Sequence, residues 1–120
     1  MQIQTESWHD SGKKYLICLG NGKCEGGGFN FFPDADPHDG LLDMCVIQKI
    51  SLLKTLPVIP RIIRGTHVRD PRITFKRIKQ VEFHSNDSFS VHTDGEFLGS
   101  DIVRLEVKIL VSRLNVIYPD

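Results

Sequence analysis

The last third of this chain alternates apolar and polar residues with a period of two, and that alternation restricts the fold more than any other feature. Five aliphatic residues share one parity: Val103, Leu105, Val107, Ile109 and Val111. Successive side chains of an extended strand point to opposite faces, so this pattern predicts a strand with one buried face and one largely wet face.

Shorter apolar segments predict further strands. These are residues 15–19, 29–32, 43–48, 73–75, 81–83 and 89–93, and residues 114–118 after a turn at Ser112-Arg113. Ile78 breaks the parity between two of them, which predicts a bulge or two separate strands. His84 to Ser88 has the composition of a turn.

One segment, from Ser51 to Arg64, has the pattern of a helix, although Pro57 and Pro60 should kink or shorten it. A chain of 120 residues is the size of one domain. We therefore expect residues 1–120 to form a single, mainly β domain, an antiparallel sandwich or part of one, with one short helical connection.

Charge is balanced overall but unevenly placed. Lys plus Arg and Asp plus Glu each number 15, which argues against a non-specific nucleic-acid binder. Between Lys49 and Lys79 the only acid is Asp70, whereas the stretch from Glu25 to Asp43 has no Lys or Arg. The basic segment could meet anionic lipid headgroups or could simply be a solvated face.

The three cysteines, Cys18, Cys24 and Cys45, are odd in number and form no CxxC motif. This usage favours a reducing, cytoplasmic setting over a disulfide framework. The apolar runs are too short to span a bilayer, so any membrane contact should be peripheral.

Glycines are concentrated in the segment Asn21 to Gly28, which follows a predicted strand. Its spacing matches neither GxGxxG nor GxxxxGK[ST], and no helix N-terminus follows to receive a phosphate. A hairpin with unusual backbone torsions is the favoured interpretation of this segment.

Two acidic motifs could carry chemistry. Residues 34–43 hold four carboxylates, which suits a hard cation or a solvated turn, but the positions of Gly and Glu exclude an EF-hand. In an extended chain Asp94 and Glu96 would lie on one face, where paired carboxylates can provide a general base. Taken alone, this motif is better interpreted as an ordinary Asp-Gly turn between strands.

Taken in order, these motifs resemble the C-terminal domain of the diacylglycerol kinase, sphingosine kinase and YegS-like lipid kinases. The matching pieces are Asn21-Gly22, Gly26-Gly27-Gly28, Pro33-Asp34-Ala35, Asp39-Gly40-Leu41-Leu42-Asp43, Leu52 to Pro57, Arg64-Gly65-Thr66-His67 and Asp94-Gly95-Glu96. The resemblance runs from about Tyr15 to Tyr118.

The resemblance implies specific roles. Glu96 would accept the proton of the lipid hydroxyl, with Asp94 beside it. A structural Mg²⁺ would sit on the acidic loop at Asp36 and Leu41, through backbone oxygens, and at the Asp39 carboxylate. ATP would bind to a separate N-terminal domain with a G-G-D-G motif, which does not occur in this sequence.

The resemblance therefore implies a portion of a lipid kinase that is inactive alone and transfers phosphate only with its ATP-binding domain. The expected partners are a lipid substrate, the missing domain and, peripherally, the inner face of a membrane. A non-catalytic β module that binds a membrane or a partner protein is the alternative. Exposed strand edges also leave a homodimer open.

Overall fold

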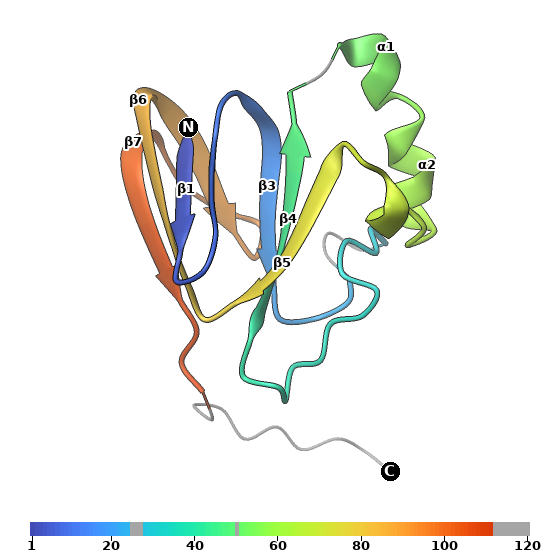
Figure 1. Cartoon of the computed structure of the whole chain (residues 1–120), viewed down its shortest axis with the longest axis horizontal. Coiled ribbons are helices and arrows are strands. Elements are labelled where there is room, and N and C mark those ends of the chain that lie inside the picture. The colour runs from blue at the N-terminus through green and yellow to red at the C-terminus, as the bar shows by residue number, and fades with distance from the viewer. Residues whose placement is uncertain (25–27, 50, 112–120) are drawn as a thin grey trace.

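The computed structural model describes residues 1–24, 28–49 and 51–111, which form two antiparallel sheets (Figure 1). The first sheet has the order β2-β1-β6-β7. Its strands are β1 (Gln2–Thr5), β2 (His9–Ser11), β6 (Gln80–Thr93) and β7 (Glu96–Lys108).

The second sheet has the order β3-β4-β5, with β4 in the centre. Its strands are β3 (Lys14–Gly20), β4 (Leu42–Gln48) and β5 (Ile73–Ile78). The connection from β4 to β5 contains α1 (Leu52–Thr55), α2 (Val58–Ile63) and a 3₁₀ turn, η1 (His67–Arg69). In Figure 1 these helices lie on the far side of the second sheet from β7.

The core has two layers because β4 is buried on both faces. Met44 and Val46 belong to a cluster between the sheets, together with Ile3, Val81 and Phe83 of the first sheet. The alternate residues of β4 belong to the other cluster, under the helices and the loop after β3; its buried members are Cys18, Phe32, Ala35, Cys45, Ile47, Val58, Ile62 and Ile73. Since both faces are covered, β4 reads in sequence as a continuous apolar run.

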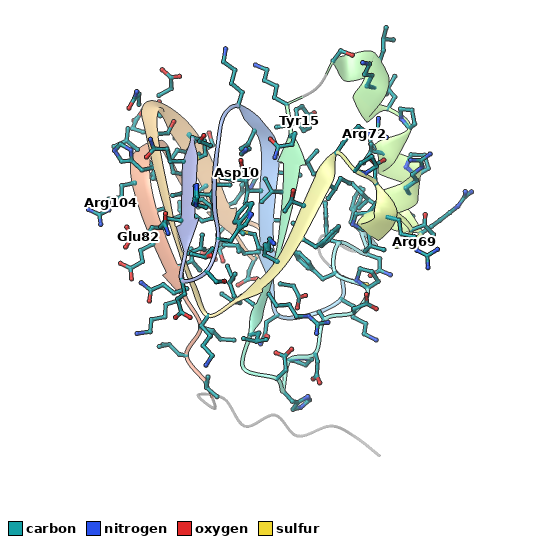
Figure 2. All side chains as sticks on the ribbon, in the orientation of Figure 1. Asp10, Tyr15, Arg69, Arg72, Glu82 and Arg104 are labelled. Carbon is teal, nitrogen blue, oxygen red and sulfur yellow. The ribbon has the colours of Figure 1, made fainter. Side chains whose placement is uncertain are left out.

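A buried polar network ties the two sheets together at one end. Lys14 Nζ lies 2.7 Å from Asp10 Oδ2 and 2.9 Å from Gln48 Oε1, and the Lys14 side chain is almost fully buried. Gln48 Nε2 donates to the same Asp10 oxygen at 3.1 Å. Asp10 lies between the sheets' neighbouring edges in Figure 2, so β2 is fixed to β3 and β4 by side chains.

The fold class predicted from sequence is confirmed: the chain is mainly antiparallel β, with one short helical connection. The strands expected at 15–19 and 43–48 are present as β3 and β4. The break at Ile78 separates β5 from β6, as the parity change indicated. The predicted strand at 114–118 and its turn lie outside the described residues.

Two local predictions were wrong. Residues 29–32 form a loop rather than a strand, because Phe31 and Phe32 turn into the core under the helices. His84 to Ser88 is not a turn but lies within β6. There the pairing advances from His84 to Phe89 on β6 but only from Arg104 to Ile102 on β7, so the extra residues are taken up as a bulge.

Helix α2 ends in a Schellman motif centred on Gly65. The Gly65 N–H donates to the Ile62 carbonyl at 3.0 Å, and the Thr66 N–H donates to the Arg61 carbonyl at 2.9 Å. Gly65 has φ +67, which glycine adopts without the penalty of a β-carbon. This sharp end directs the chain from α2 into η1 and β5.

Candidate functional site

The Asp94-Gly95 pair forms the two-residue turn that closes the β6–β7 hairpin. Thr93 pairs with Glu96, and the two turn residues have φ values of 49° and 85°. Positive φ at both positions is typical of the type I′ turn favoured by Asp-Gly. The turn is therefore the Asp-Gly turn considered above, and Asp94 does not lie in an extended segment.

The turn places both carboxylates at an exposed tip of the molecule. Asp94 and Glu96 are solvent-exposed, and Glu96 is the first residue of β7. The next two residues, Phe97 and Leu98, are also exposed, although they are apolar. Glu96 is therefore accessible from solvent, and the two apolar residues that follow it point to opposite faces of the strand.

The acidic loop folds on its own side chains. Asp36 Oδ1 accepts the His38 N–H at 2.9 Å, and Asp39 Oδ1 accepts the Leu41 N–H at 2.8 Å. The Asp39 N–H in turn donates to the Asp36 carbonyl at 3.3 Å. These hydrogen bonds bring Asp36, Asp39 and Leu41 into one short turn. The hydrogen bond from the His38 N–H keeps the pKa of the Asp36 carboxyl below its usual value.

These three residues offer hard oxygen donors, of the kind that Mg²⁺ prefers. Within the described ranges, no three His, Cys, Asp or Glu side chains gather into a metal-binding group. A cation on this loop would therefore rely on one carboxylate, backbone carbonyls and water. Mg²⁺ usually keeps several of its water ligands, so the donor set fits that ion.

Arg77 of β5 joins the base of the acidic loop to the second sheet. Its Nε lies 3.4 Å from Asp43 Oδ1, and its terminal nitrogen donates to the Asp34 carbonyl at 2.7 Å. Burial raises the pKa of the Asp43 carboxyl, and the nearby charges of Asp39 and Asp34 raise it further against the effect of Arg77. Arg77 is 34 positions from Asp43 and 43 positions from Asp34, and no local sequence pattern links them. The contact of Arg77 with the acidic loop was therefore not predicted.

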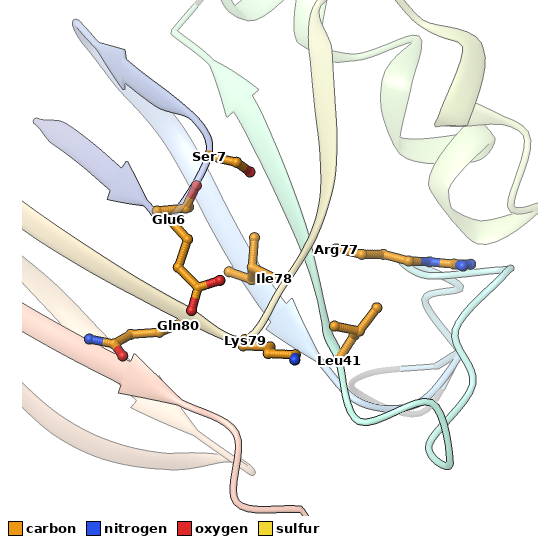
Figure 3. Close-up of a pocket in the computed structure, with 8 residues that line it drawn as sticks. Glu6, Ser7, Leu41, Arg77, Ile78, Lys79 and Gln80 are labelled. Carbon is orange, nitrogen blue, oxygen red and sulfur yellow. The ribbon is translucent and has the colours of Figure 1, made fainter.

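Two small hollows flank Arg77. One, of about 180 Å³, is lined by Asp34, Asp43, Val68, Phe75, Lys76 and Arg77. The other, of about 110 Å³, lies where β1 ends and β5 turns into β6, with Glu6, Lys79 and Gln80 in its wall (Figure 3). Ligand pockets usually enclose 300–1,000 Å³, so neither hollow could take up a whole lipid.

A buried polar cluster beneath the helices was not predicted as such. His67 is fully buried, and its Nε2 lies 3.1 Å from the Phe31 carbonyl. Its Nδ1 and the side-chain oxygen of Asn30 have no hydrogen-bond partner in the described part of the chain. Burial lowers the pKa of His67, so the neutral ring is favoured. The Arg64-Gly65-Thr66-His67 motif was visible in the sequence, but the burial of its His67 was not.

The structure keeps the two predicted sites on separate elements. Asp94 and Glu96 belong to the β6–β7 hairpin, whereas Asp36, Asp39 and Leu41 belong to the loop between β3 and β4. No described helix is long and apolar enough to cross a bilayer. The roles of these five residues stay predictions, because the geometry alone does not assign them.

Comparison with known proteins adds the family context. Residues 1–118 match the YegS C-terminal NAD kinase β-sandwich-like domain. A diacylglycerol kinase of Mycobacterium tuberculosis is 33% identical over 104 residues, which are 87% of this chain and 33% of that protein. A "Probable lipid kinase YegS-like" of Pectobacterium atrosepticum is 29% identical over 108 residues, 88% of this chain and 34% of that one.

A similar fold occurs in a solved structure. The crystal structure described as "a putative diacylglycerol kinase from Bacillus anthracis str. Sterne" matches with a TM-score of 0.69 at 22% identity, over 92% of this chain and 35% of that one. At this identity the likeness concerns the fold alone. The chain spans about a third of the length of the curated relatives it matches.

Proposed function

Because this chain belongs to the family of YegS C-terminal NAD kinase β-sandwich-like domains, we propose that it is the lipid-facing part of a kinase. The kinase transfers the γ-phosphate of ATP to a lipid hydroxyl such as that of diacylglycerol. The observation that carries this proposal is the match over nearly the whole chain, together with relatives that are named diacylglycerol kinases. The nucleotide-binding part comes from another segment of a longer protein or from a second polypeptide.

In this proposal Glu96 is the proton acceptor for the lipid hydroxyl. Phosphoryl transfer depends mainly on positioning and on charge neutralisation, so a weak base near the acceptor oxygen is sufficient. The type I′ turn fixes the backbone at Asp94 and Gly95, and Glu96 follows it as an exposed residue. Asp94, in the turn two residues before Glu96, would help to orient the hydroxyl.

The test requires a complete kinase, so this chain replaces the matching third of the M. tuberculosis diacylglycerol kinase in a chimera. We expect phosphate transfer from Mg-ATP to diacylglycerol in mixed micelles, and none by the chain alone. Glu96→Gln in the chimera should lower kcat by about 10²- to 10⁴-fold, the usual contribution of a positioned base.

Glu106→Gln is the matched control, because Glu106 is an exposed residue of the same strand. It should leave kcat close to that of the parent chimera. A folded chimera that binds ATP but transfers no phosphate would contradict the proposed function. An active Glu96→Gln chimera would instead contradict only the assignment of the base.

We further propose that the acidic loop binds a structural Mg²⁺ through the Asp36 and Leu41 carbonyls and the Asp39 carboxylate. The ion would offset the repulsion between the loop's carboxylates and stabilise its turn. Asp39→Asn is a conservative test, because the amide retains the oxygen that accepts the Leu41 N–H and loses the charge.

We expect MgCl₂ to raise the melting temperature of the parent chain, since a ligand that binds only the folded state stabilises it. The increase should be much smaller in the Asp39→Asn variant. The control is Asp87→Asn, because Asp87 is an exposed residue of β6, and its increase should equal that of the parent. If MgCl₂ raised the melting temperature of all three proteins equally, the proposal that the loop binds Mg²⁺ would be wrong.

A further inference from the structure

Two buried cysteines lie directly opposite each other on neighbouring strands of the second sheet. Cys18 of β3 is the register partner of Cys45 of β4, in a part of the ladder beyond the register shift between Lys14 and Leu16 (Figure 1). Both side chains belong to the core cluster under the helices, so they point to the same face of the sheet. All three cysteines of the chain are thiols, and Cys24 is the exposed one.

The backbone of this pair is already spaced for a disulfide. Directly opposite residues of antiparallel strands have Cα atoms about 4.5 to 5.5 Å apart. A disulfide joins residues whose Cα atoms are about 4.4 to 6.8 Å apart and whose Cβ atoms are about 3.5 to 4.5 Å apart. Opposite Cβ atoms are about 4.5 to 5.5 Å apart, so a movement of about 1 Å closes the bond. The register of the two strands does not have to change.

The surroundings of the pair leave each thiol with the other as its reaction partner. Cys18 is 9% exposed and Cys45 is 0% exposed. The other buried members of the cluster are apolar side chains, among them Phe32, Val58 and Ile62. Burial raises the pKa of the Cys45 thiol to about 12, so Cys45 is protonated at neutral pH. Because the thiolate is the nucleophile, Cys18 has to react first.

We propose that Cys18 and Cys45 form a redox site, in which hydrogen peroxide converts the two thiols reversibly into a disulfide between β3 and β4. The disulfide closes a ring that contains the whole connection between these strands, and therefore the acidic loop. Disulfides of proteins in reducing compartments are usually transient and redox-sensing. The dithiol is accordingly the resting form of the site.

The reaction uses one molecule of peroxide. The Cys18 thiolate attacks one peroxide oxygen, the O–O bond breaks, and the leaving hydroxide takes up a proton to become water. Cys18 is then a sulfenic acid. The Cys45 sulfur attacks the Cys18 sulfur, the S–O bond breaks, and the hydroxide leaves as a second water with the proton of the Cys45 thiol. The two thiols lose two electrons in total, and these reduce the peroxide.

The site is tested by oxidation in a chain that lacks the exposed cysteine. The Cys24→Ser variant is treated with hydrogen peroxide while folded, alkylated and cut with trypsin. Cleavage after Lys14, Lys23 and Lys49 places Cys18 in the peptide of residues 15–23 and Cys45 in that of residues 24–49. We expect these two peptides to be joined by a disulfide, and dithiothreitol to separate them.

The disulfide should also change the stability of the folded chain. A cross-link between Cys18 and Cys45 constrains the unfolded state, so the oxidised Cys24→Ser protein should melt about 5 to 10 °C above its reduced form. Dithiothreitol should reverse this increase. Methionine sulfoxide formed by the same peroxide would not be reversed by dithiothreitol, so the two kinds of oxidation can be told apart.

Two variants in the Cys24→Ser background separate the roles of the paired thiols. Cys18→Ala removes the thiol that reacts first, so neither a joined peptide nor a reversible rise in melting temperature should appear. Cys45→Ala keeps that thiol and removes its partner. Peroxide should then leave Cys18 as a sulfenic acid, which a sulfenic-acid reagent labels. None of these measurements needs nucleotide, lipid or Mg²⁺, so their outcome is independent of the function proposed above.

Three results would overturn the proposal. The first is that the two peptides stay separate after peroxide treatment of the folded Cys24→Ser protein. The second is a disulfide that forms only in urea, because the folded backbone would then not supply the geometry. The third is a melting temperature that falls when the disulfide forms, because the bond would then strain the folded state instead of joining its strands.

Discussion

Replacing Phe32 by alanine should lower the free energy of unfolding by about 3–5 kcal/mol, the usual cost of emptying a buried phenylalanine site. The Phe32 side chain is 2% exposed and belongs to the core cluster under the helices. Its ring lies so close to Gly20 that a β-carbon there would come within 2.4 Å of it. The surrounding backbone therefore has little freedom to close the cavity.

The effect would reach the acidic loop as well as the core. The Phe32 carbonyl accepts the Ala35 N–H at 3.0 Å, and Ala35 is itself buried at the start of the loop. Urea unfolding measures the change, with Phe29→Ala as the control because Phe29 is 39% exposed. The control should lose about 1 kcal/mol or less. Equal losses for Phe29 and Phe32 would contradict the packing described for this loop.

Asp70→Ala should cost about 3 kcal/mol, the lower end of the range for removing one partner of a buried ion pair. The Asp70 carboxylate is 2% exposed and accepts hydrogen bonds from Arg72 Nε at 2.7 Å and from an Arg61 terminal nitrogen at 2.9 Å. Both arginines reach solvent, so they can be rehydrated when Asp70 is removed, which keeps the cost at that lower end.

The same pair makes stability depend on pH. The Arg72 guanidinium holds the pKa of the Asp70 carboxyl well below its ordinary value of 3.8. The pKa is lower in the folded state, so this stabilisation is complete above the unfolded value and is lost as pH falls below it. Urea unfolding at neutral and acid pH measures this effect. The free energies of unfolding of the parent and of Asp70→Ala should become closer as the pH is lowered.

A surface ion pair provides the control for Asp70. Arg104 lies 3.2 Å from Glu82 on the outside of the first sheet, where both side chains are exposed (Figure 2). Glu82→Ala should cost about 0.5 kcal/mol or less, because exposed pairs contribute little. If Asp70→Ala costs no more than this, the buried carboxylate does not fix the corner between α2 and β5.

The local sequence pattern correctly predicted the elements whose conformation does not depend on their tertiary contacts. The apolar run of β4 and the parity break at Ile78 both predicted the observed strands. The run at 29–32 looks identical to a strand in sequence, yet Phe32 packs as a loop residue. Similarly, His84 to Ser88 have the composition of a turn, but pairing with β7 on either side holds these residues in a bulged strand.

The candidate site was predictable where its chemistry is local and not where it depends on distant residues. The Asp-Gly turn and the acidic loop could be read from their own residues. Arg77 contacts Asp43 across 34 positions, and His67 contacts Phe31 across 36. The burial of Asp70 between two arginines is likewise a property of the corner, and no pattern in the sequence indicated it.

The position of β1 has a consequence for how the chain reaches this structure. Gln2 pairs with His84 and Thr5 with Val81, so the first strand is held between β2 and a strand from the last third of the chain. Such pairing requires a long loop to close before it returns any stabilisation, which slows folding in proteins of high contact order. During synthesis β1 emerges before β6 and must wait for it. Until then the edge of β1 is exposed to any other unpaired strand.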